Sequence, residues 1–84
     1  MSCFIRIANL PPETTEEILM EYLTREPGFA DRTSVKLIND GKSAIAVIGV
    51  PWERHVGDAV ARHFNGHMYK DRQLSVRATA MFEA

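Results

Sequence analysis

The sequence predicts a small α+β domain whose elements follow the order β-α-β-β-α-β. Hydrophobic and polar residues alternate near the beginning of the chain and again near its end, which is typical of strands with one buried face. Two segments between them carry apolar residues at helical spacing. A chain of 84 residues with 45% hydrophobic content is long enough for one core, so residues 1–84 are expected to form a single domain.

The first strand is expected over residues 4–8, where Ile5 and Ile7 face the core. Pro11-Pro12 ends this strand. The helix that follows is predicted to begin at Thr14, because Thr14 and Glu17 have the spacing of a capping box. The buried side of this helix should consist of its regularly spaced apolar residues, which are Ile18, Leu19, Tyr22 and Leu23.

A β-hairpin is predicted in the middle of the chain. Pro27-Gly28 should end the first helix, and alternation resumes over residues 34–38. Asn39-Asp40-Gly41 supplies turn residues, and the apolar run over residues 43–50 is typical of a central strand. This hairpin forms the second and third strands.

The second helix is expected to begin at Pro51 and to end at Asn65-Gly66. The last strand is predicted over residues 73–78, with Leu74 and Val76 inward. Right-handed crossovers would then place the first and third strands at the centre of the sheet. The second helix should bury the residues that recur at helical spacing, which are Gly57, Val60, Ala61 and Phe64.

Charge and cysteine content limit the function classes. The net charge of −1 does not favour nucleic acid, although a basic patch can lie on a nearly neutral domain. The single cysteine, Cys3, excludes an internal disulfide, and no run is apolar enough to span a bilayer or to act as a signal peptide. We therefore expect an intracellular domain, excised from a longer protein.

Catalytic and metal-binding patterns are not found in the sequence. His55, His63 and His67 lack a second group of ligand residues, and Cys3 falls inside a predicted strand. Asn65-Gly66 should separate His63 from His67, and no glycine-rich phosphate loop occurs. The sequence therefore predicts no enzyme, no metal site and no cofactor.

Three short segments carry a resemblance to a known family. The run Ile5–Leu10, with Ala46-Val47-Ile48 and Phe64-Asn65-Gly66, resembles the RNA recognition motif family over nearly the whole chain. The resemblance implies a ferredoxin-like sandwich, in which two helices cover one face of a four-stranded antiparallel sheet and aromatic rings on the other face stack on RNA bases. Here Arg6, Ile45 and Val47 occupy the three aromatic positions. All three stacking platforms are absent.

We interpret the chain as a noncanonical RNA recognition motif that binds single-stranded RNA weakly, without DNA specificity, beside other domains in RNA processing. Its predicted contacts are basic residues of the sheet and loops and an apolar floor: Arg6, Lys36, Arg77, Lys42, Lys70, Phe4, Ile45 and Val47. In another interpretation, Arg6 pairs with an acidic neighbour, and Ala80, Met81 and Phe82 cover the apolar floor and occlude RNA.

Two subclasses of the family offer alternatives. The quasi form in heterogeneous nuclear ribonucleoproteins of the F and H type also replaces the first aromatic by a basic residue and binds RNA through loops, which here would use Lys42, Lys70 and Arg72. The protein-binding UHM subclass lacks sheet aromatics and has an acidic first helix. That similarity implies a protein partner at an alternative set of residues, namely Glu16, Glu17, Glu21, Trp52 and Tyr69. A protein partner could also dock on the apolar patch of the sheet face.

Overall fold

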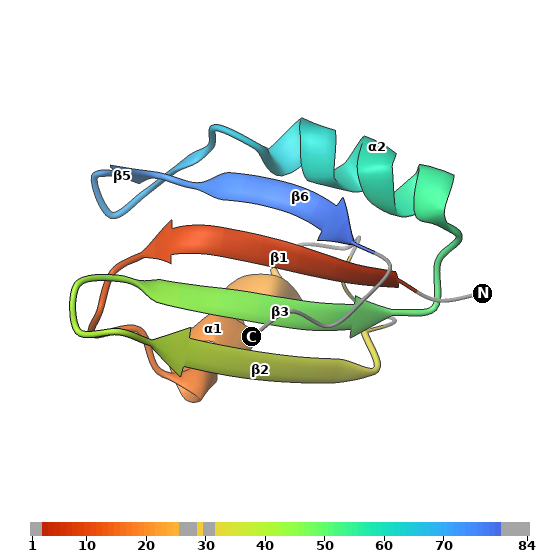
Figure 1. The fold of residues 1–84 in the computed structure, drawn as a ribbon. Coiled ribbons are helices and arrows are strands. Elements are labelled where there is room, and N and C mark those ends of the chain that lie inside the picture. The colour runs from red at the N-terminus through yellow and green to blue at the C-terminus, as the bar shows by residue number, and fades with distance from the viewer. Residues whose placement is uncertain (1–2, 26–28, 30–31, 80–84) are drawn as a thin grey trace.

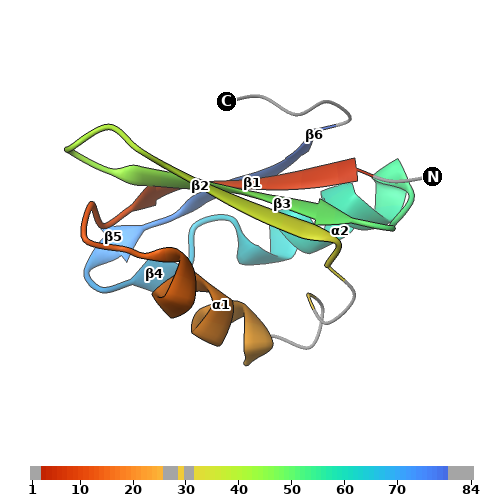
Figure 2. The ribbon, with the colours of Figure 1, turned by 90° about the horizontal axis from the view of Figure 1, so that it is seen from below.

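The computed structural model describes residues 3–25, 29 and 32–79, which form an antiparallel sheet with two helices on one face (Figures 1 and 2). The four-stranded sheet has the order β2-β3-β1-β6, which confirms that the first and third strands are central. The strands of this sheet and the two helices are, in chain order, β1 (Cys3–Leu10), α1 (Glu16–Thr24), β2 (Ser34–Asn39), β3 (Ala44–Val50), α2 (Arg54–Phe64) and β6 (Ser75–Thr79). Two short strands, β4 (Met68–Tyr69) and β5 (Arg72–Gln73), form a separate hairpin.

The core lies between the sheet and the helices. Ile5 and Ile48 are opposite each other on the central strands, and both are fully buried. Phe29 packs between Trp52 and Phe64, with ring centroids 5.7 and 5.6 Å away. Most of the predicted inward residues are confirmed by their burial in this core, and they are Ile7, Leu19, Leu23, Leu74 and Val76. Tyr22 packs against the core, but Ile18 is only partly buried and lies outside it, so this part of the prediction for α1 is wrong.

The start of α1 differs from the prediction. Thr15, not Thr14, is the N-cap, and its hydroxyl oxygen accepts a hydrogen bond from the Ile18 amide at 3.2 Å. Thr14 is buried, and its amide donates to the Pro11 carbonyl at 3.0 Å in the preceding turn. The predicted capping box between Thr14 and Glu17 is therefore wrong. Thr14 belongs to the turn after β1, so the N-cap is one residue later than predicted.

The predicted turn between β2 and β3 is confirmed, and side chains stabilise it. The Asn39 side-chain oxygen accepts from the Gly41 amide at 2.7 Å, and Gly41 has a φ of 92°. One Asp40 carboxylate oxygen accepts from the amides of Lys42 and Ser43 at 2.9 and 2.8 Å. These hydrogen bonds, with that from Ser43 contributing most, hold the pKa of Asp40 below its ordinary value of 3.8.

The second helix begins at Arg54, three residues after the predicted start at Pro51. Trp52 therefore precedes the helix, and its half-buried side chain packs against the core. Gly57 faces Cys3, whose sulfur would lie only 2.6 Å from a β-carbon on Gly57. The absence of that carbon allows α2 to approach β1 closely. The predicted end at Asn65-Gly66 is confirmed, since Asn65 is the C-cap and Gly66 has a φ of 88°.

The β4–β5 hairpin was not predicted from the sequence. Its turn consists of Lys70 and Asp71, which both have positive φ angles, 49° and 66°. The half-buried Arg72 guanidinium connects this hairpin to the rest of the sheet, because it donates to the carbonyls of Leu10 and Lys42 at 3.3 and 3.2 Å. The predicted last strand over residues 73–78 is thus divided between β5 and β6.

The two edges of the four-stranded sheet differ. Helix α2 runs beside β6 (Figure 1), and the Asn65 side-chain oxygen accepts from the Val76 amide at 3.0 Å. The Arg54 guanidinium donates to the Ala78 carbonyl at 3.3 Å. Among the described residues of β2 other than Lys36, no backbone group has a comparable side-chain cap. Neither helix of the described chain has the length and apolar character needed to cross a bilayer.

Candidate nucleic-acid interface

The face of the sheet opposite the helices, the open face, carries a row of basic side chains. Arg6 of β1 is opposite Val47 of β3 on one side and Arg77 of β6 on the other. Val47 is in turn opposite Lys36 of β2. The strand register therefore confirms that Arg6, Lys36 and Arg77 share one side of the sheet. We call Lys36, Val47, Arg6 and Arg77 the basic row.

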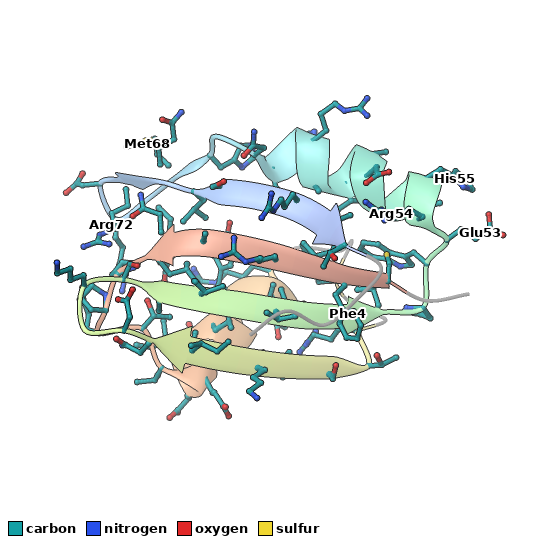
Figure 3. The ribbon with its side chains drawn as sticks, in the orientation of Figure 1. Phe4, Glu53, Arg54, His55, Met68 and Arg72 are labelled. Carbon is teal, nitrogen blue, oxygen red and sulfur yellow. The ribbon has the colours of Figure 1, made fainter. Side chains whose placement is uncertain are left out.

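Arg6 and Arg77 have no acidic partner among the described residues. The ion pairs there join Arg25 to Glu21 at the end of α1, and Arg54 to Asp58 and His55 to Glu53 at the start of α2. Figure 3 labels Glu53, Arg54 and His55. The interpretation in which Arg6 pairs with an acidic neighbour thus finds no support in the described structure. Two arginines in directly opposed positions repel each other, and a bound anion would relieve this repulsion.

The apolar floor is less accessible than the sequence suggested. Val47 belongs to the open face and not to the core cluster, yet it is only 2% exposed. Direct contact of a ligand with Val47 would therefore require neighbouring side chains to move. Ile45 is partly exposed and is opposite Ile38 of β2. Residues 80–82, which were expected to cover this floor, lie outside the described residues.

Phe4 is an aromatic residue of the open face, one row away from the basic row. It is opposite Gly49 of β3 and Thr79 of β6, and it is partly exposed (Figure 3). A β-carbon on Gly49 would lie 3.4 Å from Phe4 Cε1, so the ring reaches across to β3 above the glycine. Gly49 thus makes room for the ring close to the backbone.

The two predicted loop lysines are not brought together. Lys42 is exposed at the end of the β2–β3 hairpin. Lys70 lies in the β4–β5 turn, where its ammonium group is 5.5 Å from the centre of the Tyr69 ring. Tyr69 packs edge-on against Tyr22 of α1 at 5.0 Å, which places it on the helix side. Lys70 therefore does not extend the basic row.

The alternative protein-binding residues do not form one surface. Glu21 and Tyr69 line the same hollow beside α1, together with Ile18, Tyr22, Arg25 and Lys70. Glu16 instead lines a separate hollow beside β2, and Glu17 is exposed on the first turn of α1. Trp52 packs on Phe29 in the core, whereas Tyr69 packs on Tyr22 of α1.

Metal-binding and nucleophilic groups are sparse in the described chain. No three His, Cys, Asp or Glu side chains gather there closely enough to hold a metal ion. The rings of His63 and His67 approach to 5.8 Å although Asn65-Gly66 separates them. Burial raises the pKa of the Cys3 thiol, which lies under α2.

Comparison with solved structures identifies the fold. The third RNA recognition motif of Pes4 has a TM-score of 0.71 at 20% identity, covering 96% of this chain and 94% of that one. The Rna15 motif with bound RNA (GU) has a TM-score of 0.64 at 19% identity, covering 87% and 78%. The C-terminal motif of MEC-8 bound to AGCACA has a TM-score of 0.64 at 21% identity, covering 99% and 94%.

The chain therefore has the RNA recognition motif fold, as the sequence predicted. No protein-family model matches it, and no curated protein matches it closely.

Proposed function

We propose that this domain binds single-stranded RNA through its open face. The observation that carries the proposal is the basic row, in which three cations cross the sheet and neither arginine has an acidic partner among the described residues. Two structures of similar fold are of complexes, that of Rna15 with bound RNA (GU) and that of MEC-8 bound to AGCACA. The shared fold and the local charge support the same ligand class.

In this proposal the basic row binds the phosphate backbone. Arginine presents a planar fork of donors to phosphate, and Arg6 and Arg77 stand side by side on neighbouring strands. The guanidinium plane of Arg6 can also stack on a base. Lys36 adds charge on the far side of Val47. Phosphate contacts of this kind give affinity and register and carry little sequence information.

The proposed affinity of the isolated domain is low. Each base that stacks on an aromatic ring contributes about 1–3 kcal/mol, and the three ring positions expected from the family hold Arg6, Ile45 and Val47 instead. Phe4 replaces only one of these platforms. We propose that the domain acts in RNA processing beside other RNA-binding segments, whose linkage raises the effective affinity.

The experiment that tests the proposal is titration of fluorescent single-stranded RNA homopolymers at two salt concentrations. The wild-type domain should bind at low salt and lose affinity as salt rises. Arg6→Ala should weaken binding to every homopolymer. Absence of wild-type binding at low salt would overturn the proposal.

A loop-based mode of RNA binding gives a different result. In that case Arg6→Ala leaves the affinity unchanged, and joint substitution of Lys42 and Lys70 abolishes binding.

The alternative is a protein-interaction domain that uses the hollow beside α1. One observation favours it: Tyr22 and Tyr69 form an edge-on aromatic pair there, and the neighbouring Met68 is 67% exposed. Tyr69→Ala should abolish such an interaction without changing RNA affinity. RNA competition against a bound protein partner would show whether the two surfaces are independent.

A further inference from the structure

Three polar or aromatic groups from two strands and a loop converge above Gly49. The Phe4 ring reaches this position from β1, and the hydroxyls of Ser34 and Thr33 reach it from the start of β2. A β-carbon on Gly49 would overlap the Ser34 hydroxyl, and it would lie 2.9 Å from Thr33 Oγ1 and 3.4 Å from Phe4 Cε1. We call Phe4, Thr33, Ser34 and Gly49 the Gly49 notch.

The backbone fixes the geometry of the notch. The Thr33 amide donates a hydrogen bond to the Gly49 carbonyl at 2.8 Å, so the residue just before β2 is held against β3. Ser34 is directly opposite Gly49, and Gly49 is directly opposite Phe4. The two hydroxyls therefore lie beside the aromatic ring because position 49 has no side chain.

The hydroxyls of Thr33 and Ser34 are suited to bind an external polar group. Both residues are exposed. Within the described chain neither hydroxyl makes a hydrogen bond to another residue, although backbone groups nearby are paired. A single hydroxyl can donate or accept, so it can pair with any base edge. Two hydroxyls on neighbouring residues can select among base edges, because both can pair at once only with an edge whose polar groups have the matching spacing.

We infer that the Gly49 notch is a nucleotide-reading site, in which one base stacks on Phe4 and its polar edge hydrogen-bonds to Thr33 and Ser34. This inference rests on the proposed RNA-binding function and adds the source of base preference to it. Stacking on a ring tolerates every base, because each base has a π face. Discrimination at this site therefore comes from the two hydroxyls.

The distance from the notch to the basic row matches the size of one nucleotide. Phe4 and Arg6 are two residues apart on β1, as are Ser34 and Lys36 on β2. Residues at this spacing point to the same face and lie about 7 Å apart along the strand. A base on Phe4 thus leaves its own phosphate within reach of Arg6 or Lys36.

The test measures the affinity of the domain for four RNA hexamers, each of a single base type, at low salt. The wild-type domain should prefer one hexamer over the weakest by about fivefold or more. The double variant Thr33→Val with Ser34→Ala should reduce this preference to about twofold or less, since each lost hydrogen bond changes affinity by about three- to tenfold. Gly49→Ala should reduce the preference as well, because the added carbon displaces both hydroxyls.

Ser75→Ala is the matched control. Ser75 is an exposed hydroxyl residue on the same face, opposite Ala8 and away from the notch, and its loss should leave the preference unchanged. The inference is overturned if the wild type binds all four hexamers equally, or if the double variant folds and keeps the wild-type preference. Failure of the wild type to bind any hexamer removes the proposed function, and the inference with it, which is a different result from binding without discrimination.

Discussion

The two faces of the sheet carry opposite kinds of side chain on the same four strands. On the covered face, aliphatic side chains such as Ile5 and Ile48 are fully buried against the helices. On the open face, Arg6, the residue after Ile5 on β1, is opposite Arg77 of β6. The covered face specifies the fold through apolar periodicity, which many sequences can satisfy. This is why the fold persists at 19–21% identity to the solved neighbours.

Apart from the buried Val47 and Gly49, the residues of the open face are partly or fully exposed, so they are free to specify the ligand. Opposed like charges slightly destabilise a sheet, so Arg6 beside Arg77 is a local cost that a phosphate ligand would offset. Residues that break a local rule in this way are expected at functional sites. The comparison therefore predicts that stability and binding depend on separate sets of residues.

The largest expected effect is on the free energy of unfolding, which should respond differently to substitutions on the two faces. Ile48→Ala on the covered face should lower the free energy of unfolding by about 2–5 kcal/mol, because it leaves a cavity in the core. Ile45→Ala, three residues earlier on the open face, should cost about 1 kcal/mol, because Ile45 is only partly buried. Urea denaturation of both variants measures the difference. Equal losses would show that the two faces share one core.

Phe4 should give the next largest effect, in binding. Phe4→Leu removes a stacking surface and should weaken binding of single-stranded RNA by about 1–3 kcal/mol, with little change in the salt dependence. Fluorescence anisotropy at several salt concentrations measures both quantities. If RNA affinity is unaffected while the protein remains folded, the open face binds without base stacking on Phe4.

A smaller effect is expected from the charge of the basic row. Arg6→Gln should reduce the slope of log affinity against log salt by about 0.7, the value for one phosphate contact on a single strand. Its stability should be unchanged or slightly higher, since the repulsion with Arg77 is removed. Arg25→Gln is the control, because Arg25 pairs with Glu21 on α1, away from the open face. An equal change of slope in both variants would mean that net charge alone controls binding.

The smallest effect is expected outside both faces, in the β2–β3 turn. Asp40 has a pKa below 3.8 in the folded protein, so its contribution to stability is complete above that value and is lost as the pH falls through the folded pKa. Asp40→Asn should therefore be less stable than the wild type at about pH 6, and the difference should shrink towards about pH 3. Urea midpoints at the two pH values test this, and a difference independent of pH would contradict it.

The sequence predicted the elements that repeat a simple pattern. Alternation identified β1 and β2, and turn residues followed by an apolar run identified the hairpin with β3. Helical spacing identified the buried sides of α1 and α2 except at Ile18, which is only partly buried. The boundaries were less accurate. Thr14 and Thr15 are adjacent and chemically equivalent, so the sequence could not show which one the turn after β1 would place at the N-cap. The β4–β5 hairpin was missed because its two-residue strands are too short to show alternation.

The candidate site was predicted in part. The shared side of Arg6, Lys36 and Arg77 followed from strand parity and is confirmed by the register. The separation of Lys70 from this row depends on the unpredicted hairpin. The Gly49 notch was missed, although a glycine inside an apolar strand is a signal for close approach of other groups. Only the register shows which side chains make that approach.

The unequal edges of the sheet have a consequence for self-assembly. A strand edge with unsatisfied backbone groups can recruit another strand, and a molecule with two such edges can propagate without limit into a fibre. Here the Asn65 side-chain oxygen accepts from the Val76 amide, and the Arg54 guanidinium donates to the Ala78 carbonyl, on one edge. Edge-to-edge recruitment through β2 is therefore expected to join two copies and to extend less readily beyond them, because the opposite edge is partly capped.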